Sequence, residues 1–115
     1  MSKKLIFTTI SIIYIIILLA GASIIKLESS SQPGSDKVLH FIGFFILTLI
    51  LIFTFESYKA KRSMSITFIT ALIIGFIIEF MQLGIPGRTF SLLDVLADLL
   101  GIVLALVLRW SFYKG

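Results

Sequence analysis

The sequence predicts an all-α membrane protein, a bundle of four transmembrane helices with both termini in the cytoplasm. Of its 115 residues 58% are hydrophobic and 14% charged, and the mean hydropathy is +1.12. A soluble domain of this size cannot bury so much apolar surface. The apolar residues form four blocks, each near the ~20 residues that a helix needs to cross a bilayer. The four blocks therefore predict a single domain over residues 1–115. The chain has no cysteine, which excludes disulfides and thiolate metal sites.

The first helix is expected at about residues 5–25, after the basic residues Lys3 and Lys4. A secretory signal peptide is the alternative, because a basic start and the small residues at 20–22 are typical of a cleavage site. The apolar run continues through Ile25, beyond the roughly 7–15 residues of a signal-peptide core. Its length therefore favours a helix that is retained.

The other three helices are expected at about residues 37–55, 66–83 and 92–108. Their N-cap candidates are Ser35 or Asp36, Ser63 or Ser65, and Ser91, respectively. Pro33-Gly34 and Pro86-Gly87 mark turns in the two loops that precede the second and fourth helices. These loops lie on the same side of the membrane.

The basic residues predict the orientation. One side receives Lys3, Lys4, Lys59, Lys61, Arg62, Arg109 and Lys114, and the other receives Lys26, Lys37 and Arg88. Because cytoplasmic loops carry the excess of Lys and Arg, the first side is predicted to be cytoplasmic. The net charge of +4 reflects this topology, so the expected partner is the lipid bilayer and not nucleic acid.

Polar residues gather toward the outward ends of the helices and define the candidate site. They are Asp36, Lys37, His40, Glu79, Gln82, Arg88, Asp94 and Asp98. A charged residue within an apolar span costs about 2.5–3.5 kcal/mol on insertion scales, so these side chains should face one another, a cavity or a ligand. At 1.5 Å per residue, His40, Glu79 and Asp98 all lie roughly 6–9 Å inside their helices. The sequence therefore predicts an outward-facing polar pocket.

Small residues lie on the same helix faces as the polar ones. Ala71 and Gly75 precede Glu79, and Ala97, Gly101 and Ala105 follow one another at four-residue intervals. This spacing lets membrane helices approach closely, which turns the polar faces toward the bundle interior. The same stripes are also compatible with an oligomer.

Several of these polar residues have a purely structural alternative. Asp94 with Ser91 forms a capping box, Asp36 is a helix cap, Lys37 snorkels to the surface, and His40 makes a structural hydrogen bond to Glu79 or Asp36. Glu79 and Asp98 lie too deep to be caps. Arg88 is the expected counter-charge, and its guanidinium suits a carboxylate or a phosphate.

Three motifs resemble the VanZ-like family of small bacterial membrane proteins, named after a protein tied to teicoplanin resistance. They are Asp36-Lys37-Val38-Leu39-His40-Phe41, Glu79-x-x-Gln82, and Arg88-x-x-Ser91-x-x-Asp94-x-x-x-Asp98-x-x-Gly101. The family usually has asparagine at the position of Asp98, so this chain carries an additional carboxyl group. The resemblance implies a multi-pass protein of the bacterial cell membrane and an effect on teicoplanin resistance. It implies no particular reaction.

Two functions fit this pattern. The first is binding of a cell-wall precursor, lipid head group or glycopeptide in the outward pocket, with no cofactor and no metal site. The alternative is an enzyme acting on a lipid-linked phosphate or sugar, with His40 as general base and Asp94 and Asp98 as ligands of Mg²⁺. The sequence contains no P-loop, nucleophile elbow or His-Glu-x-x-His motif. The inner halves of the helices lack charged residues, which argues against an ion path.

Overall fold

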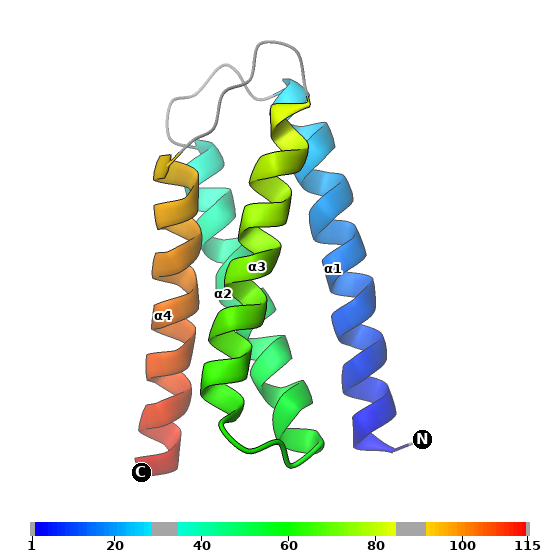
Figure 1. Cartoon of the computed structure of the whole chain (residues 1–115), viewed down its shortest axis with the longest axis vertical. Coiled ribbons are helices and arrows are strands. Elements are labelled where there is room, and N and C mark those ends of the chain that lie inside the picture. Colours follow the sequence, from blue (N-terminus) through cyan, green and yellow to red (C-terminus); the bar gives the residue numbers. More distant parts are fainter. Residues whose placement is uncertain (1, 29–34, 85–91, 115) are drawn as a thin grey trace.

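A computed structural model describes the backbone of residues 2–28, 35–84 and 92–114 (Figure 1). It contains four helices: α1 (Lys3–Glu28), α2 (Ser35–Ser57), α3 (Ser63–Leu83) and α4 (Leu92–Lys114). The described residues contain no strand. The prediction of an all-helical chain with four helices is confirmed.

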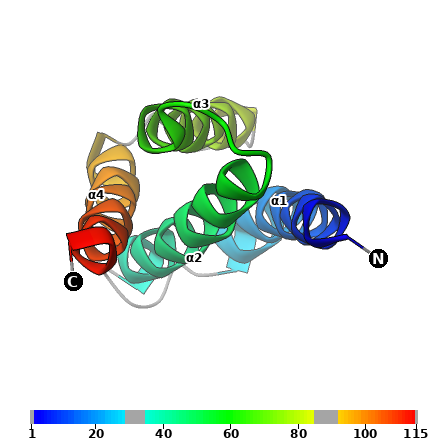
Figure 2. The same cartoon turned by 90° about the horizontal axis from the view of Figure 1, so that it is seen from below.

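The helices stand side by side, and neighbours in the sequence run in opposite directions (Figure 1). α2 and α4 begin at one end of the bundle, which we call the site end. α1 and α3 begin at the opposite end, which we call the basic end. Helices α2 and α3 each contact all three other helices, and the most extensive contact is between α2 and α4, whereas the described parts of α1 and α4 do not meet (Figure 2).

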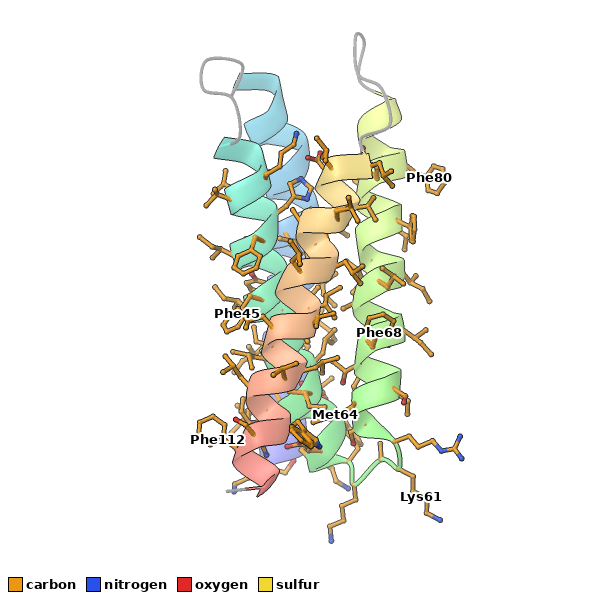
Figure 3. All side chains as sticks on the ribbon, turned by 90° about the vertical axis from the view of Figure 1, so that its left-hand side faces the viewer. Phe45, Lys61, Met64, Phe68, Phe80 and Phe112 are labelled. Atoms are coloured by element: carbon orange, nitrogen blue, oxygen red, sulfur yellow. The ribbon has the colours of Figure 1, made fainter. Side chains whose placement is uncertain are left out.

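Three helices are long and apolar enough to cross a membrane. The spans are Lys3–Gly21, Lys37–Ser57 and Ser63–Met81. Helix α4 has 23 residues but carries Asp94, Asp98 and Arg109, and it is not among them. Large apolar side chains project outward, as Phe80 and Phe112 do in Figure 3. These features indicate a membrane protein, while the fourth span and the cytoplasmic termini stay predictions.

The contact between α2 and α4 depends on Gly101. A Cβ atom at this position would overlap the carbonyl oxygen of Phe41 and lie 3.0 Å from the backbone nitrogen of Phe45. Ala97 and Ala105, one turn away on either side, are buried as well. The small-residue face of α4 is therefore packed against the backbone of α2.

A second contact joins α2 and α4 at the basic end. The guanidinium of Arg109 donates to both carboxylate oxygens of Glu56, over 3.1 Å from Nε and 2.7 Å from Nη2. The same group lies over the ring of Phe53, 4.8 Å from its centroid. This bidentate pair has the geometry of strong charge-assisted hydrogen bonds. Arg109 was predicted on the cytoplasmic side, but its pairing with Glu56 was not predicted from the sequence.

Helix α1 is joined to α2 through side-chain hydroxyls. The bonds are Tyr14 to the carbonyl of Gly43 at 2.7 Å, Ser11 to Thr54 at 2.7 Å, and Thr8 to Tyr58 at 2.8 Å. Thr8, Ser11 and Tyr14 follow one another at three-residue intervals, so all three lie on one face of α1. In an apolar environment these bonds satisfy groups that would otherwise lack partners. This interface was not among those predicted from the sequence.

The turn after α2 places a lysine where helices usually have glycine. The amide of Ala60 donates to the carbonyl of Phe55 at 3.1 Å, and the amide of Lys59 donates to that of Glu56 at 2.9 Å. This is a Schellman cap, whose left-handed residue is usually glycine. Here that residue is Lys59, with φ of 56°.

A second left-handed residue, Arg62 with φ of 58°, immediately precedes α3. Helix α3 begins at Ser63, three residues before the predicted start at residue 66. The Ser63 hydroxyl donates to the carbonyl of Ala60 over 2.7 Å, a different bond from that of the expected N-cap. The two left-handed residues therefore complete the short reversal between α2 and α3.

Replacing Gly101 by alanine is expected to destabilise the bundle by about 1–3 kcal/mol, because the methyl group pushes α4 away from the α2 backbone. Unfolding in mixed detergent micelles, followed by circular dichroism, measures the change. Gly84→Ala is the control, since among the described atoms a Cβ there would have the Met81 carbonyl as its near neighbour, at an ordinary contact distance of 3.4 Å. Equal stability of the two variants would contradict the close contact.

Replacing Lys59 by glycine is expected to raise the unfolding free energy by about 1 kcal/mol, because glycine adopts the left-handed conformation without steric cost. The same unfolding assay in a zwitterionic detergent measures it. Lys61→Gly removes an equal charge from the same turn at a residue without positive φ, so it should give no such gain. A gain in Lys61→Gly as large as that in Lys59→Gly would assign the effect to charge instead.

Candidate functional site

The candidate site forms where the first turns of α2 and α4 lie side by side. Lys37 and His40 are three residues apart on α2, and Asp94 and Asp98 are four apart on α4. Each spacing places its pair on a single helix face. The close approach at Gly101, one turn below Asp98, brings the two faces together.

The imidazole of His40 lies between two carboxylates. Its Nδ1 is 2.7 Å from Oδ1 of Asp98, and its Nε2 is 3.7 Å from Oδ2 of Asp94. The second oxygen of Asp94, Oδ1, is 3.1 Å from Nζ of Lys37. Lys37, Asp94, His40 and Asp98 therefore form a continuous chain of alternating basic and acidic groups across two helices.

Helix α3 covers this chain with Gly75 and Glu79. A Cβ atom at Gly75 would lie 3.1 Å from Oδ2 of Asp98 and 3.5 Å from Cε1 of Phe44. The absence of a side chain thus leaves space for the Asp98 carboxylate against α3. Glu79, one turn further along the same face, lies close enough to act electrostatically on Asp98. We call Lys37, His40, Glu79, Asp94 and Asp98 the polar cluster.

The polar cluster is almost entirely enclosed. The residues Glu79, Asp94 and Asp98 are 2%, 0% and 2% exposed, and the His40 side chain is 9% exposed. The Lys37 side chain is the most accessible member, at 37%. Charges removed from water must be paired or hydrogen-bonded, and the distances among Lys37, Asp94, His40 and Asp98 meet that requirement.

The structure brings five of the eight predicted site residues together. His40 contacts Asp98, a partner that the sequence analysis did not name. Asp94 lies between Lys37 and His40, with its side chain fully buried. The side chains of Asp36 and Gln82, together with Arg88 and the capping partner Ser91, lie outside the described residues.

The carboxylates of the cluster face basic side chains. No group of His, Asp and Glu suited to hold a metal ion occurs among the residues whose side chains are described. Asp94 and Asp98, proposed above as a Mg²⁺ pair for the enzyme alternative, instead face Lys37 and His40. The arrangement favours charge-assisted hydrogen bonding over metal binding.

Comparison with known proteins places this architecture in a family. The profile of the VanZ/LLP1 family matches residues 3–113. This chain belongs to the VanZ-like family. An uncharacterized protein of the yeast Schizosaccharomyces pombe is 33% identical to it over 102 residues, which are 89% of this chain and 63% of the relative. The VanZ-like chain thus spans less than two thirds of that relative's length, and no solved structure matches it.

The yeast relative bears on the expected bacterial origin. The resemblance implied a bacterial protein, but the similarity found here extends to a eukaryote. A bacterial source therefore stays a prediction. The membrane character is supported by the three apolar spans.

Replacing Gly75 by alanine is expected to shift the ¹⁵N resonances of His40, because the new methyl group displaces the carboxylate that bonds its Nδ1. His40 is the only histidine of the chain, so selective labelling gives an unambiguous signal. Gly43→Ala is a matched control, since a Cβ there meets Leu18 of α1 at a similar 3.2 Å. An unchanged spectrum in Gly75→Ala would show that the space left at Gly75 does not position the Asp98 carboxylate.

Proposed function

We propose that this VanZ-like protein binds the polar head group of a lipid or lipid-linked cell-wall precursor at the polar cluster. The observation that carries the proposal is the contact of His40 with both Asp98 and Asp94 inside an otherwise apolar bundle. The cluster lies at the site end, within roughly 6–9 Å of the helix starts, where head groups of one leaflet are found. On the predicted topology this is the outer leaflet.

Stability alone is a weak reason to keep such a cluster. Replacing a buried set of ion pairs by apolar side chains of similar size is often neutral or stabilising. Ionisable groups inside membrane bundles accordingly mark functional sites by default. The second ion pair between α2 and α4, Arg109 with Glu56, is more exposed and lies at the bundle end, where no ligand is needed to account for it.

The composition of the cluster indicates the chemistry of the ligand. Three carboxylates stand against one lysine and one histidine among the described side chains. Ionised carboxylates only accept hydrogen bonds, so they favour a ligand with amine or hydroxyl donors. Lys37, the most accessible member, lies where such a ligand would enter. The yeast relative supports a ligand that bacterial and yeast membranes share, such as a lipid head group, over a glycopeptide.

An effect on teicoplanin resistance is the expected consequence if the ligand is a cell-wall precursor. In that case the protein would act on the outer face of a bacterial cell membrane. Teicoplanin susceptibility of a host expressing the chain, with and without Glu79→Gln or Arg88→Ala, distinguishes this role from binding of a general membrane lipid.

A second candidate function rests on the 2.7 Å contact between His40 and Asp98. A carboxylate that accepts a hydrogen bond from Nδ1–H of a histidine fixes the tautomer in which Nε2 is the base. In this candidate His40 would deprotonate a hydroxyl of a lipid-linked phosphate or sugar. The binding function would give no turnover, whereas the enzyme would convert its ligand with time.

The test of the proposed function follows the ¹⁵N signals of His40 in phosphatidylcholine nanodiscs during addition of short-chain phosphatidylethanolamine or phosphatidylglycerol. We expect a saturable shift with at least one of these lipids, and at least a tenfold weaker response in Glu79→Gln. Loss of one charge-assisted hydrogen bond, about 1.5–3 kcal/mol, accounts for that factor. Mass spectrometry of the lipids after incubation detects turnover.

Two variants make this test specific. Thr67→Val changes a buried residue of similar shape on the same helix α3, whose hydroxyl has no hydrogen-bond partner in the described structure, so it should bind like the unmodified chain. Asp98→Asn restores the usual family residue and keeps an oxygen for His40, so the ligand should still bind. Absence of a saturable shift with every lipid would refute head-group binding at this cluster.

A further inference from the structure

The basic end of the bundle carries a concentration of exposed cations. They are Lys3 and Lys4 at the start of α1, and Lys59, Lys61 and Arg62 in the turn between α2 and α3. Nζ of Lys4 lies 5.5 Å from the ring centroid of Tyr58, which joins the two groups. Figure 3 shows Lys61 extending away from the helices at this end. We call these five residues the basic surface.

Among the side chains that the structure describes, no carboxylate pairs with the basic surface. Of the six acidic residues of the chain, Glu56 alone belongs to a helix end on this side, and Arg109 holds both of its oxygens. Within the described part of the chain, none of the five cations forms an ion pair. Their charges therefore face outward from the bundle.

Two of these cations occupy positions that glycine would fill at lower cost. Lys59 and Arg62 have φ of 56° and 58° in a turn whose cap normally uses glycine. Both side chains are exposed and neither packs into the core. A strained residue that contributes nothing to packing points to a role for its side chain. Here the property that glycine would remove is the positive charge.

Aromatic residues border the basic surface. Tyr58 and Trp110 are 51% and 49% exposed at the same end of the bundle. Such residues are typical of the interface between hydrocarbon and head groups. The basic surface therefore lies at the level of the lipid phosphates, where clustered lysine and arginine attract anionic lipids.

We propose that the basic surface is a docking site for the anionic head groups of phospholipids in the adjacent leaflet. The head-group phosphate would lie among the side chains of Lys59, Lys61 and Arg62, with Lys3 and Lys4 adding to the attraction. This surface is at the opposite end from the polar cluster, so the proposal is independent of the head-group binding proposed there. It also accounts for the positive charge of Lys59 and Arg62 at left-handed positions that would suit glycine.

The fluorescence of Trp110 provides the assay, because Trp110 is the only tryptophan of the chain. It follows Arg109, which binds Glu56 at the end of α2, next to the turn between α2 and α3. The whole chain is placed in equimolar vesicles of phosphatidylcholine and phosphatidylglycerol, with one or the other lipid brominated near its head group. Quenching of Trp110 by each brominated lipid gives their relative association. We expect phosphatidylglycerol to be preferred at low salt and the preference to weaken as salt rises.

The decisive variant is Lys59→Gly combined with Arg62→Gly, which removes two charges and should also relieve strain. Its preference for phosphatidylglycerol should fall by up to about fivefold for each cation removed. Because the variant is expected to be more stable in phosphatidylcholine alone, misfolding would not account for the loss. The charge-conserving exchange of Lys59→Arg with Arg62→Lys should keep the preference.

The results decide the proposal in either direction. A preference that falls severalfold in the double glycine variant and persists in the exchanged variant supports the docking surface. Equal quenching by the two lipids in the unmodified chain would overturn it. An undiminished preference in the double glycine variant would also overturn it, since the charges at the strained positions would then not bind the lipid.

Discussion

The close approach of α4 to the backbone of α2 at Gly101 is the constraint on which the rest of the structure depends. Hydrogen bonds of 2.7 Å between side chains on two helices require the helices to approach closely, and a residue with a Cβ at position 101 would prevent this. The cluster at the site end and the pair of Glu56 and Arg109 at the basic end are both joined across this contact. Helix α3 then packs against both members of an α2 and α4 pair that is fixed at two levels, and α1 packs against α2 and α3.

The two ends of the bundle use charge in opposite ways. At the site end, acidic and basic groups alternate within hydrogen-bonding range and are removed from water. At the basic end, Arg109 pairs with Glu56, and the five cations of the basic surface are exposed. A buried arrangement suits selective recognition of a small polar group, whereas an exposed one suits the less selective attraction of a charged membrane surface.

Much of the fold followed from the sequence, because an apolar block of about 20 residues has few alternatives to a membrane helix. Depth along the helices also placed His40 and Asp98 at similar levels, since the rise per residue is fixed. Which residues pair could not be predicted, because pairing depends on helix rotation and on which helices are neighbours. The contact of His40 with Asp98, the pair of Glu56 with Arg109, and the hydroxyl bonds of α1 all required that information. The left-handed conformation of Lys59 had no signal in the sequence, where glycine would have been the marker.

The small-residue face of α4 has a consequence for self-association. Gly101 packs against the α2 backbone, and Ala97 and Ala105 on the same face are buried within the single chain. The outer face of α4 presents branched residues such as Leu96, Leu100 and Val107. Such side chains pack about as well against acyl chains as against another protein, so they provide little driving force for dimerisation in a bilayer. A dimer would therefore have to form through a surface other than the small-residue face of α4. A high concentration of the protein in the membrane would not by itself cause self-association through α4.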